Sequence, residues 1–411
     1  MSGQDPIAAA LESYVETGQM AGAVALVWRD GRLAQASVVG WRDFEANLRL
    51  ERDTIFRIAS MTKPVTSAAA MMLIEEGRIA LDDPITLWAP EFADMRVLRR
   101  PDGPLDQTDP AAGPITFGDL LTHRSGLTYG SFHTGPLAKA YEAALGSDMD
   151  SRLTPDDWIA AVAALPLIDQ PGAGFHYGNS TDVLGLLIAR IEGSPLEDVL
   201  RRRIFEPLGM ADTGFFVPEH KRHRRAQMYG FDKSGALVPR PNGPIMSGPA
   251  GVLLADRTED GYFVAGSGGL WSTTDDYMTF ARMFVGQGAV DGVRLLQPKT
   301  LALMMANHLT DDQRTRGETF GMPIFTAHGF GLGVAVVMDP DKAAVTRCKG
   351  GLGTVGWPGA YGGWWQADPT DGTVMVFLTH NVIELHQFAL GVGLGVYGAI
   401  MEFHALASRG A

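Results

Sequence analysis

Apolar runs near both ends of the chain have the length and composition of β-strands. Ala23–Trp28 and Leu33–Val39 flank Asp30-Gly31, a dipeptide that favours a tight hairpin turn. Near the C-terminus, Gly363–Asp368 and Thr373–Thr379 flank a second turn sequence and predict another hairpin. The two remaining segments with strand character are Tyr262–Trp271 and Phe330–Met338.

The middle of the chain has helical patterns instead. Ser60–Gly77 is an Ala-rich apolar run in which Pro64 falls in the first turn, where proline is tolerated, and Gly77 is placed to end the helix. A second helical pattern places Leu184, Leu187, Ile188 and Ile191 on one stripe and ends at Gly193. Ser194–Glu197 then has the pattern of a capping box and predicts another helix.

This order of elements predicts an α+β fold, an α/β sandwich with a mostly antiparallel sheet flanked by helices. The sheet is expected to form from both chain ends, residues 1–85 and 255–411, and to carry an inserted mainly helical domain, residues 86–254. A cleft between the two domains is the expected site. The loops Val97–Thr116 and Lys233–Asp260 are expected to shape its pocket.

Composition narrows the classes of partner and compartment. The formal net charge of -13 disfavours nucleic acid, because an acidic surface repels a polyanion, and the basic cluster Lys221–Arg225 is interpreted as a solvated loop. The single Cys348 cannot form an internal disulfide. Met1–Met20 lacks the pattern of a secretory signal, and Phe388–Met401 is too short to cross a membrane, so we expect a cytoplasmic protein without membrane contact. Nothing in the sequence indicates the oligomeric state.

The candidate chemistry begins at Ser60-Met61-Thr62-Lys63. Residues at i and i+3 share one face of a helix, so the Lys63 amine can lie within reach of the Ser60 hydroxyl. Other schemes are not supported, since the sequence contains neither G-x-S-x-G nor H-E-x-x-H. His176 is interpreted as a hydrogen-bonded structural histidine rather than a base. Gly351–Gly356 matches the dinucleotide fingerprint, but Trp357-Pro358-Gly359 follows where a helix should begin.

Phe56–Pro64 resembles the nucleophile motif of the serine β-lactamase and penicillin-binding-protein superfamily, in its class C β-lactamase-related, family VIII carboxylesterase branch. Further blocks occur in the order expected for that superfamily, so the similarity spans nearly the whole chain. These blocks are Leu120–Leu127, Tyr177-Gly178-Asn179, Glu206–Met210 and Gly268–Thr273. The resemblance implies a β-lactamase/transpeptidase-like fold and a serine hydrolase that needs no metal or cofactor.

The resemblance also implies a role for each matched residue. Ser60 becomes the acylated nucleophile, and a base must remove its proton, which leaves Lys63 and Tyr177 as the two candidates. Asn179 is expected to orient substrate and the lysine, or to cap the helix that follows it. The backbone N–H groups of Ser60 and Ala360 are expected to form the oxyanion hole.

Trp357-Pro358-Gly359 stands where β-lactamases have K-T-G, and this is where the chain departs from their pattern. Trp357 offers an apolar face instead of a cation, which favours esters over β-lactams, and Gly359 permits close approach of substrate. Pro358 replaces the middle glycine of the W-G-G-like triplet of family VIII esterases, which puts the pairing of this strand in question. Tyr129 and the pair Trp364-Trp365 are expected to line or support an aromatic pocket, or, for the tryptophans, to pack in the core.

Three functions follow from these residues. The favoured one is a carboxylesterase that cleaves small or aromatic esters through a Ser60 acyl-enzyme. The second is a β-lactamase, an amidase or D-aminopeptidase, or an acyltransferase of the same superfamily. The third is a penicillin-recognising sensor that is acylated without turnover, a class that usually carries a membrane anchor or an export signal.

Overall fold

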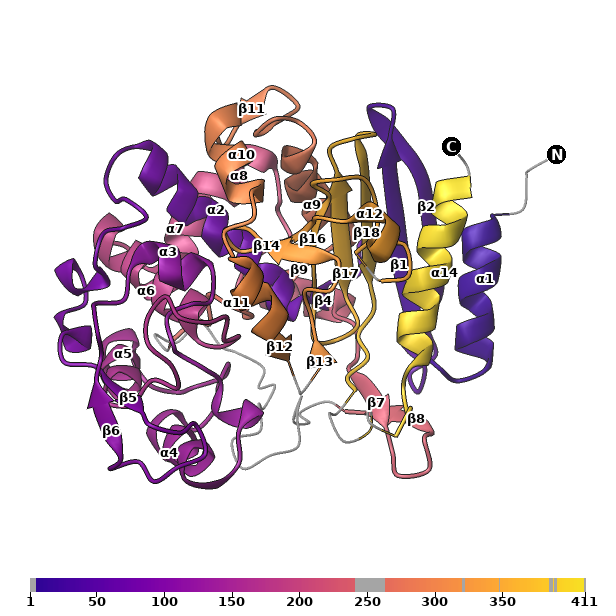
Figure 1. The fold of residues 1–411 in the computed structure, drawn as a ribbon. Helices are drawn as coiled ribbons and strands as arrows, with labels where there is room; N and C mark the ends of the chain where they lie inside the picture. Colours follow the sequence, from indigo (N-terminus) through magenta and orange to yellow (C-terminus); the bar gives the residue numbers. More distant parts are fainter. Residues whose placement is uncertain are drawn as a thin grey trace.

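The computed structural model describes residues 5–240, 263–319, 322–346, 348–383, 387 and 390–409. Strands from both chain ends form a sheet on one side of the molecule, and the helices of the middle segment gather on the other side (Figure 1). The predicted fold class is thereby confirmed. The expected domain boundary at residues 254 and 255 lies outside the described residues.

The large sheet has eight strands, and each pair of neighbours is antiparallel. Its order, from one edge to the other, is β14-β15-β16-β17-β18-β1-β2-β3. These strands are β1 (Gly22–Arg29), β2 (Arg32–Asp43), β3 (Leu48–Arg49), β14 (His328–Phe330), β15 (Ala335–Val337), β16 (Val355–Pro358), β17 (Trp364–Asp368) and β18 (Thr373–Leu378).

The hairpin between β1 and β2 confirms the prediction from Asp30-Gly31. Both residues have positive φ angles, 52° and 71°, as a tight turn between antiparallel strands requires. The hairpin between β17 and β18 is confirmed as well. The segment Phe330–Met338, predicted as one strand, contains the last residue of β14, a turn at Gly333 with a φ of 90°, and the whole of β15.

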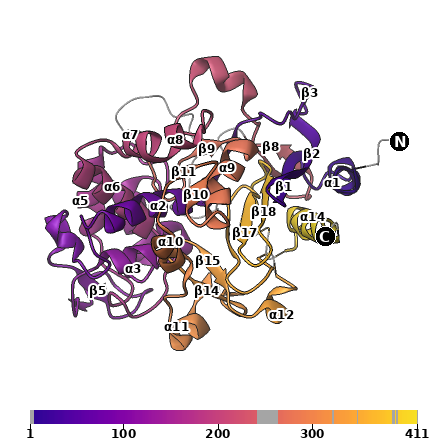
Figure 2. The ribbon, with the colours of Figure 1, turned by 90° about the horizontal axis from the view of Figure 1, so that it is seen from above.

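The two faces of the sheet bury different sets of side chains. On β1, Ala23, Ala25 and Val27 pack with α1 (Pro6–Glu16) and α14 (Gly395–Arg409), which lie side by side on the outer face (Figure 2). The alternate residues of β1 and β18 enter the main core instead. The period of two along each strand therefore separates an outer layer from the core that holds the site.

The remaining elements are short strands and helices. The two-stranded ladders pair β4 (Phe56–Arg57) with β9 (Trp271–Ser272), β5 (Arg96–Leu98) with β6 (Thr108–Pro110), β7 (Tyr229–Phe231) with β8 (Leu237–Pro239), β10 (Ala289–Val290) with β11 (Val293–Arg294), and β12 (Glu318–Thr319) with β13 (Met322–Pro323). The other helices are α2 (Thr62–Glu75), α3 (Phe117–Leu121), α4 (Gly135–Leu145), α5 (Pro155–Ala163), α6 (Ser180–Glu192), α7 (Leu196–Leu200), α8 (Glu206–Leu208), α9 (Thr274–Ala281), α10 (Pro298–Met305), α11 (Asp311–Arg316) and α12 (Pro340–Ala343). Within the described ranges, no helix combines the length and the apolar composition needed to cross a lipid bilayer.

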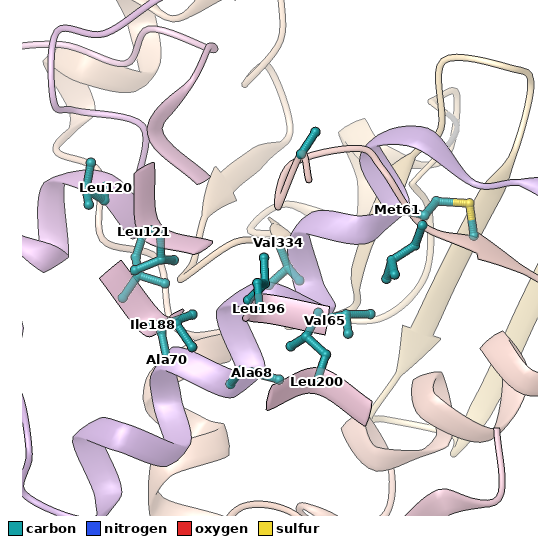
Figure 3. Close-up of a cluster of buried hydrophobic side chains, with 14 of the residues drawn as sticks. Met61, Val65, Ala68, Ala70, Leu120, Leu121, Ile188, Leu196, Leu200 and Val334 are labelled. Carbon is teal, nitrogen blue, oxygen red and sulfur yellow. The ribbon is translucent and has the colours of Figure 1, made fainter. Parts of the chain in front are cut away.

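Helix α2 is buried along twelve successive residues, from Thr62 to Leu73. Val65, Ala68 and Ala70 pack against side chains of α3, α6 and α7, as Figure 3 shows. A helix that is apolar on all sides belongs inside a protein, and its small alanines allow the neighbouring helices to come close. The candidate nucleophile therefore sits at the end of a helix that the core fixes on every side.

Three details of the sequence prediction need correction or placement. Of the segment Tyr262–Trp271, predicted as a strand, the structure describes residues 263–271, and only Trp271 of these lies in a strand, β9. The capping box expected at Ser194–Glu197 is absent, because Pro195 is the N-cap residue of α7 and no side chain caps this helix. Of the expected pocket loops, Val97–Thr116 contains β6 and part of β5, and residues 241–260 lie outside the described residues.

A buried ion pair lies close to the start of α2. Arg57 Nη2 donates to Asp150 Oδ1 at 2.6 Å, and the two side chains are only 1% and 3% exposed. We expect Asp150→Ala to lower the free energy of unfolding by about 3–5 kcal/mol, because it leaves the buried Arg57 charge without this partner. Urea denaturation measures the loss. Asp109→Ala removes the exposed pair with Arg99 and should cost at most about 1 kcal/mol; equal losses in the two variants would contradict the expectation.

Candidate active site

Ser60 lies in a 3₁₀ turn, Ala59–Met61, that continues directly into α2. Ala59 takes a φ of 47°, a left-handed conformation that costs a non-glycine residue roughly 1–2 kcal/mol. Neighbouring segments hold the turn in place: Ile58 N–H donates to the carbonyl of Leu270, and the Tyr277 hydroxyl donates to the carbonyl of Met61. Ser60 itself is half-buried among buried neighbours. The Ser60 side chain is therefore partly accessible, whereas the residues on either side of it are buried.

Lys63 is 1% exposed and is surrounded by electron-rich groups. Its Nζ donates to the Tyr129 hydroxyl at 3.2 Å and to the carbonyl of Ser267 at 3.1 Å. The same nitrogen lies 4.4 Å from the centre of the Tyr177 ring and 5.5 Å from that of Tyr129. Hydrogen-bond acceptors and aromatic faces stabilise a positive charge, so this environment suits an ammonium ion.

Tyr129 lies between Lys63 and Ser267. Its hydroxyl accepts from Lys63 and donates to Ser267 Oγ at 2.8 Å. Burial, followed by the nearby Asp182 charge, raises the pKa of Tyr129 well above its usual value. Tyr129 therefore remains a phenol at neutral pH. The sequence analysis expected this residue to line a pocket, and the structure places it, 4% exposed, in the network that holds Lys63.

Tyr177 is half-buried and is enclosed by aromatic rings. Its hydroxyl accepts from Trp357 Nε1 at 3.2 Å. Its ring stacks on Phe132 with centroids 6.0 Å apart, and the ring of His123 lies 4.9 Å away. Burial and the Lys63 charge lower the pKa of His123 well below its usual value, so this imidazole is neutral. The structure thus brings Tyr177, Lys63 and Trp357 together from three segments far apart in the sequence.

Asn179 is fully buried at the N-cap position of α6, but its side chain does not cap the helix. Instead its Nδ2 donates to the carbonyl of Thr128 at 2.9 Å, which ties the start of α6 to the segment that carries Tyr129. A Cβ added to Gly178 would lie 2.3 Å from Thr128 Cα. The middle position of Tyr177-Gly178-Asn179 therefore requires glycine.

Trp357 and Gly359, at the C-terminal end of β16 and just after it, lie beside the nucleophile turn. Pro358 is the last residue of β16 and pairs with Trp364, so proline does not prevent the pairing of this strand. A Cβ added to Gly359 would lie 2.6 Å from the carbonyl oxygen of Ile58, two residues before Ser60. This close approach explains the glycine and places Ala360, which is exposed, beside the turn.

Known proteins resemble this chain over most of its length. The family model described as Beta-lactamase matches residues 7–389, which is most of the chain. The chain belongs to this family.

Several relatives in this family cover nearly the same length. Protein Rv1367c of Mycobacterium tuberculosis is 44% identical over 377 residues, covering 92% of this chain and 90% of the relative. Esterase EstB of Burkholderia gladioli is 31% identical over 384 residues, again covering 92% and 90%. Among solved structures, EstCE1, a hydrolase with promiscuous acyltransferase activity, superposes with a TM-score of 0.78 at 28% identity, covering 95% of this chain and 97% of EstCE1.

The other sequence candidates lie outside the Lys63 network. His176 Nε2 is 2.9 Å from Asp169 Oδ2, which gives this histidine a structural partner. Trp364 packs with α14 on the outer face of β17, and Trp365 packs in the main core against Phe284, so both tryptophans are core residues. Among the described residues there is no group of three or more histidine, cysteine, aspartate or glutamate side chains placed to hold a metal ion.

The sequence analysis missed three polar residues of the candidate site. Ser267 supplies a carbonyl to Lys63 and a hydroxyl to Tyr129. Asp148 accepts the backbone N–H groups of Gly130 and Ser131, both at 3.1 Å, and so fixes the segment after Tyr129.

Asp182 is the third missed residue, and it is fully buried on α6. Burial raises its pKa to about 6, although the Lys63 charge opposes this rise. Its signal in the sequence was an acid directly before the apolar run Val183–Ala189.

Proposed function

We propose that this chain is a serine hydrolase of the family VIII carboxylesterase type, which cleaves small or aromatic carboxylic esters through a Ser60 acyl-enzyme. Substrate binds in a cleft between the sheet and the inserted helical segment. The observation that carries the proposal is the enclosure of Lys63 by two tyrosines and a carbonyl, one helical turn after Ser60. The similarity to Esterase EstB and to EstCE1 supports the same class of reaction.

Tyr177 acts as the base in this proposal, and Lys63 acts as a fixed positive charge. Three contacts of Lys63 Nζ favour the ammonium form, which cannot accept a proton. The same charge beside the Tyr177 ring stabilises a phenolate, and the Trp357 N–H donates to its oxygen. Tyr129 is held as a phenol by burial, which leaves Tyr177 as the tyrosine suited to proton transfer.

The reaction then proceeds in two half-reactions. Ser60 Oγ attacks the ester carbonyl carbon while its proton passes to the Tyr177 oxygen. The backbone N–H groups of Ser60 and Ala360 donate to the oxyanion of the tetrahedral intermediate. The alkoxide of the substrate leaves with the proton held by Tyr177. A water molecule, deprotonated by Tyr177, attacks the acyl-Ser60 ester, and the carboxylic acid departs as Ser60 regains its proton.

Trp357 supports esters rather than β-lactams as substrates. It contacts Tyr177 through a neutral indole N–H, and its ring packs against Tyr177 and Phe330 with centroids 5.5 and 5.2 Å away. An apolar ring at this position offers no charge to a substrate carboxylate, whereas it suits an uncharged acyl or aromatic group.

The direct test is a substrate panel on the purified protein. We expect hydrolysis of p-nitrophenyl esters with short acyl chains, and turnover of a chromogenic cephalosporin that is at least about 100-fold slower in kcat/KM, as loss of one charged contact predicts. Faster turnover of the cephalosporin than of every ester would overturn the substrate assignment.

Acyl transfer to an alcohol is the second candidate function, favoured by the similarity to EstCE1. The acyl-Ser60 ester is the same in both reactions, and an alcohol replaces water in the second half-reaction. Adding an alcohol to the ester assay distinguishes the two, because a transferase forms a new ester that chromatography detects. Release of free acid alone would leave hydrolysis as the function.

Trp357→Phe tests the contact between the indole and Tyr177. The phenyl ring keeps the apolar surface but removes the N–H that donates to the Tyr177 oxygen. We expect kcat/KM for the ester to fall about 10- to 100-fold, as for the loss of a hydrogen bond to a charged group.

Trp364→Phe is the matched control for this variant. Trp364 lies on the outer face of β17, and its Nε1 donates to Gln366 Oε1 at 3.4 Å. This change should leave kcat/KM and its pH profile unchanged. A kcat/KM of Trp357→Phe equal to that of Trp364→Phe would refute the role of the indole N–H.

A further inference from the structure

We propose that Asp182 is a positioning residue, the buried counter-ion that keeps Lys63 charged and fixed beside Ser60. The inference rests on the proposed role of Lys63 as a cation. Asp182 lies on α6, five residues after Tyr177, and is fully buried. Unlike Lys63 and Tyr177, it is not expected to touch the substrate.

Asp182 reaches Lys63 through a short chain of contacts. Its Oδ1 accepts the backbone N–H of Ser267 at 3.0 Å. The carbonyl of the same Ser267 accepts from Lys63 Nζ at 3.1 Å, and its hydroxyl accepts from Tyr129. One carboxylate thus fixes the peptide segment from which Lys63 and Tyr129 are both held.

Asp182 also acts on Lys63 through its charge. Its Oδ2 is buried and has no hydrogen-bond partner among the described residues. A buried carboxylate without a full set of partners is costly unless a cation compensates it. Lys63 is the cation that favours the charged form of Asp182, and by reciprocity Asp182 favours the charged form of Lys63.

Other titratable groups around Asp182 do not replace this pairing. The elements packed on α6 include α2, α3, α5 and α7. Lys63 comes from α2, His123 and Tyr129 from the segment after α3, and Asp148 from the loop before α5. Burial raises the pKa of Asp148, and the acids of α5 and α7 are at least partly exposed. Asp119 of α3 is buried, but its carboxylate accepts from Thr116 and pairs with Arg124. Lys63 is therefore the cation that faces Asp182 in this buried cluster.

The ammonium charge of Lys63 matters for the proposed mechanism because Lys63 stabilises the Tyr177 phenolate only while it is protonated. Loss of the Asp182 charge favours the neutral amine at a lower pH. The amine then no longer supports the phenolate, and the alkaline limit of activity moves toward neutrality. A residue with only a packing role would not change that limit.

Asp182→Asn is the test, because asparagine keeps an oxygen for the Ser267 N–H and removes the charge. We expect kcat for an ester to fall about 10- to 100-fold with KM changed less than about threefold. The alkaline limb of the kcat profile should move about one pH unit lower, the shift expected for the loss of one nearby charge. The rate at which a fluorophosphonate probe labels Ser60 should fall and shift in the same way.

Asp276→Asn is the matched control. Asp276 on α9 is also largely buried, and burial raises its pKa to about 6, but it accepts from Asp212 N–H and Thr213. This change should leave kcat, labelling and the pH profile unchanged. A folded Asp182→Asn variant with an unshifted profile and a labelling rate equal to that of Asp276→Asn would overturn the proposal.

A measurement on the unaltered protein covers the case in which Asp182→Asn does not fold. In ¹⁵N NMR, with the signal assigned by its absence in Lys63→Met, Lys63 should be an ammonium at pH 7. A neutral amine at that pH would overturn the proposal. Failure of the wild type to hydrolyse any ester would instead count against the proposed substrate class, since probe labelling and the lysine signal do not depend on it.

Discussion

Replacing Ser60 with alanine is expected to abolish ester hydrolysis, with kcat/KM lowered by about 10⁴-fold or more. Ser60 supplies the oxygen that forms the acyl-enzyme, and its removal leaves no nucleophile in the turn Ala59–Met61. The alanine methyl group fits where the serine side chain lies, so the fold should be retained. Hydrolysis of a short-chain p-nitrophenyl ester and circular dichroism measure the two effects.

Covalent labelling makes this expectation sharper. A fluorophosphonate probe should modify Ser60 in the wild type and give no adduct in Ser60→Ala. Ser67→Ala is the control, since Ser67 is buried on α2 about two turns beyond Ser60 and has no part in the proposed chemistry. A labelled peptide that lacks Ser60, or retained turnover in Ser60→Ala, would refute the assignment of the nucleophile.

Tyr177→Phe should cause the second largest loss, about 10²- to 10⁴-fold in kcat, the range for removing a general base. Phenylalanine preserves the stacking with Phe132 and the contact with the Lys63 ammonium, and it removes only the hydroxyl. Both half-reactions need that oxygen, so the burst of p-nitrophenol and the steady-state rate should slow together. Stopped-flow absorbance resolves the two phases.

Tyr141→Phe provides the comparison for this loss. Tyr141 is a buried tyrosine of α4 outside the Lys63 network, and its change should leave kcat as in the wild type. If Tyr177→Phe keeps more than about a tenth of wild-type kcat, a general base at Tyr177 is excluded. Lys63 would then be the base, since it is the other candidate that the sequence left open.

The sequence predicted the sheet better than the segment that holds Lys63. The turn at Asp30-Gly31 has a local cause, so its hairpin was predictable. The described part of Tyr262–Trp271 has strand-like composition, yet its peptide groups pair with side chains. Ser267 N–H donates to Asp182, and the Gly266 and Ser267 carbonyls accept from Thr66 and Lys63. Such partners come from distant helices, and no local pattern reveals them.

The residues of the candidate site also differ in how well the sequence predicted them. Ser60, Lys63, Tyr177 and Asn179 belong to short motifs and were predictable by resemblance. The bond from Trp357 to Tyr177 joins residues 180 positions apart, and it appears only once β16 lies against the nucleophile turn. Asp148 and Asp182 were missed because an isolated acid in a sequence is usually exposed, and only burial identifies it as part of a site.

Strand β1 lies in the middle of the sheet and pairs on one side with β18, where Val24 is opposite Leu378. A ribosome that has made β1 must therefore add some 350 further residues before that neighbour exists. Until then the apolar β1–β2 hairpin has an open edge, which invites pairing with other chains. We expect the nascent chain to depend on chaperones, and deletion of the last strand to yield insoluble protein rather than a smaller folded one.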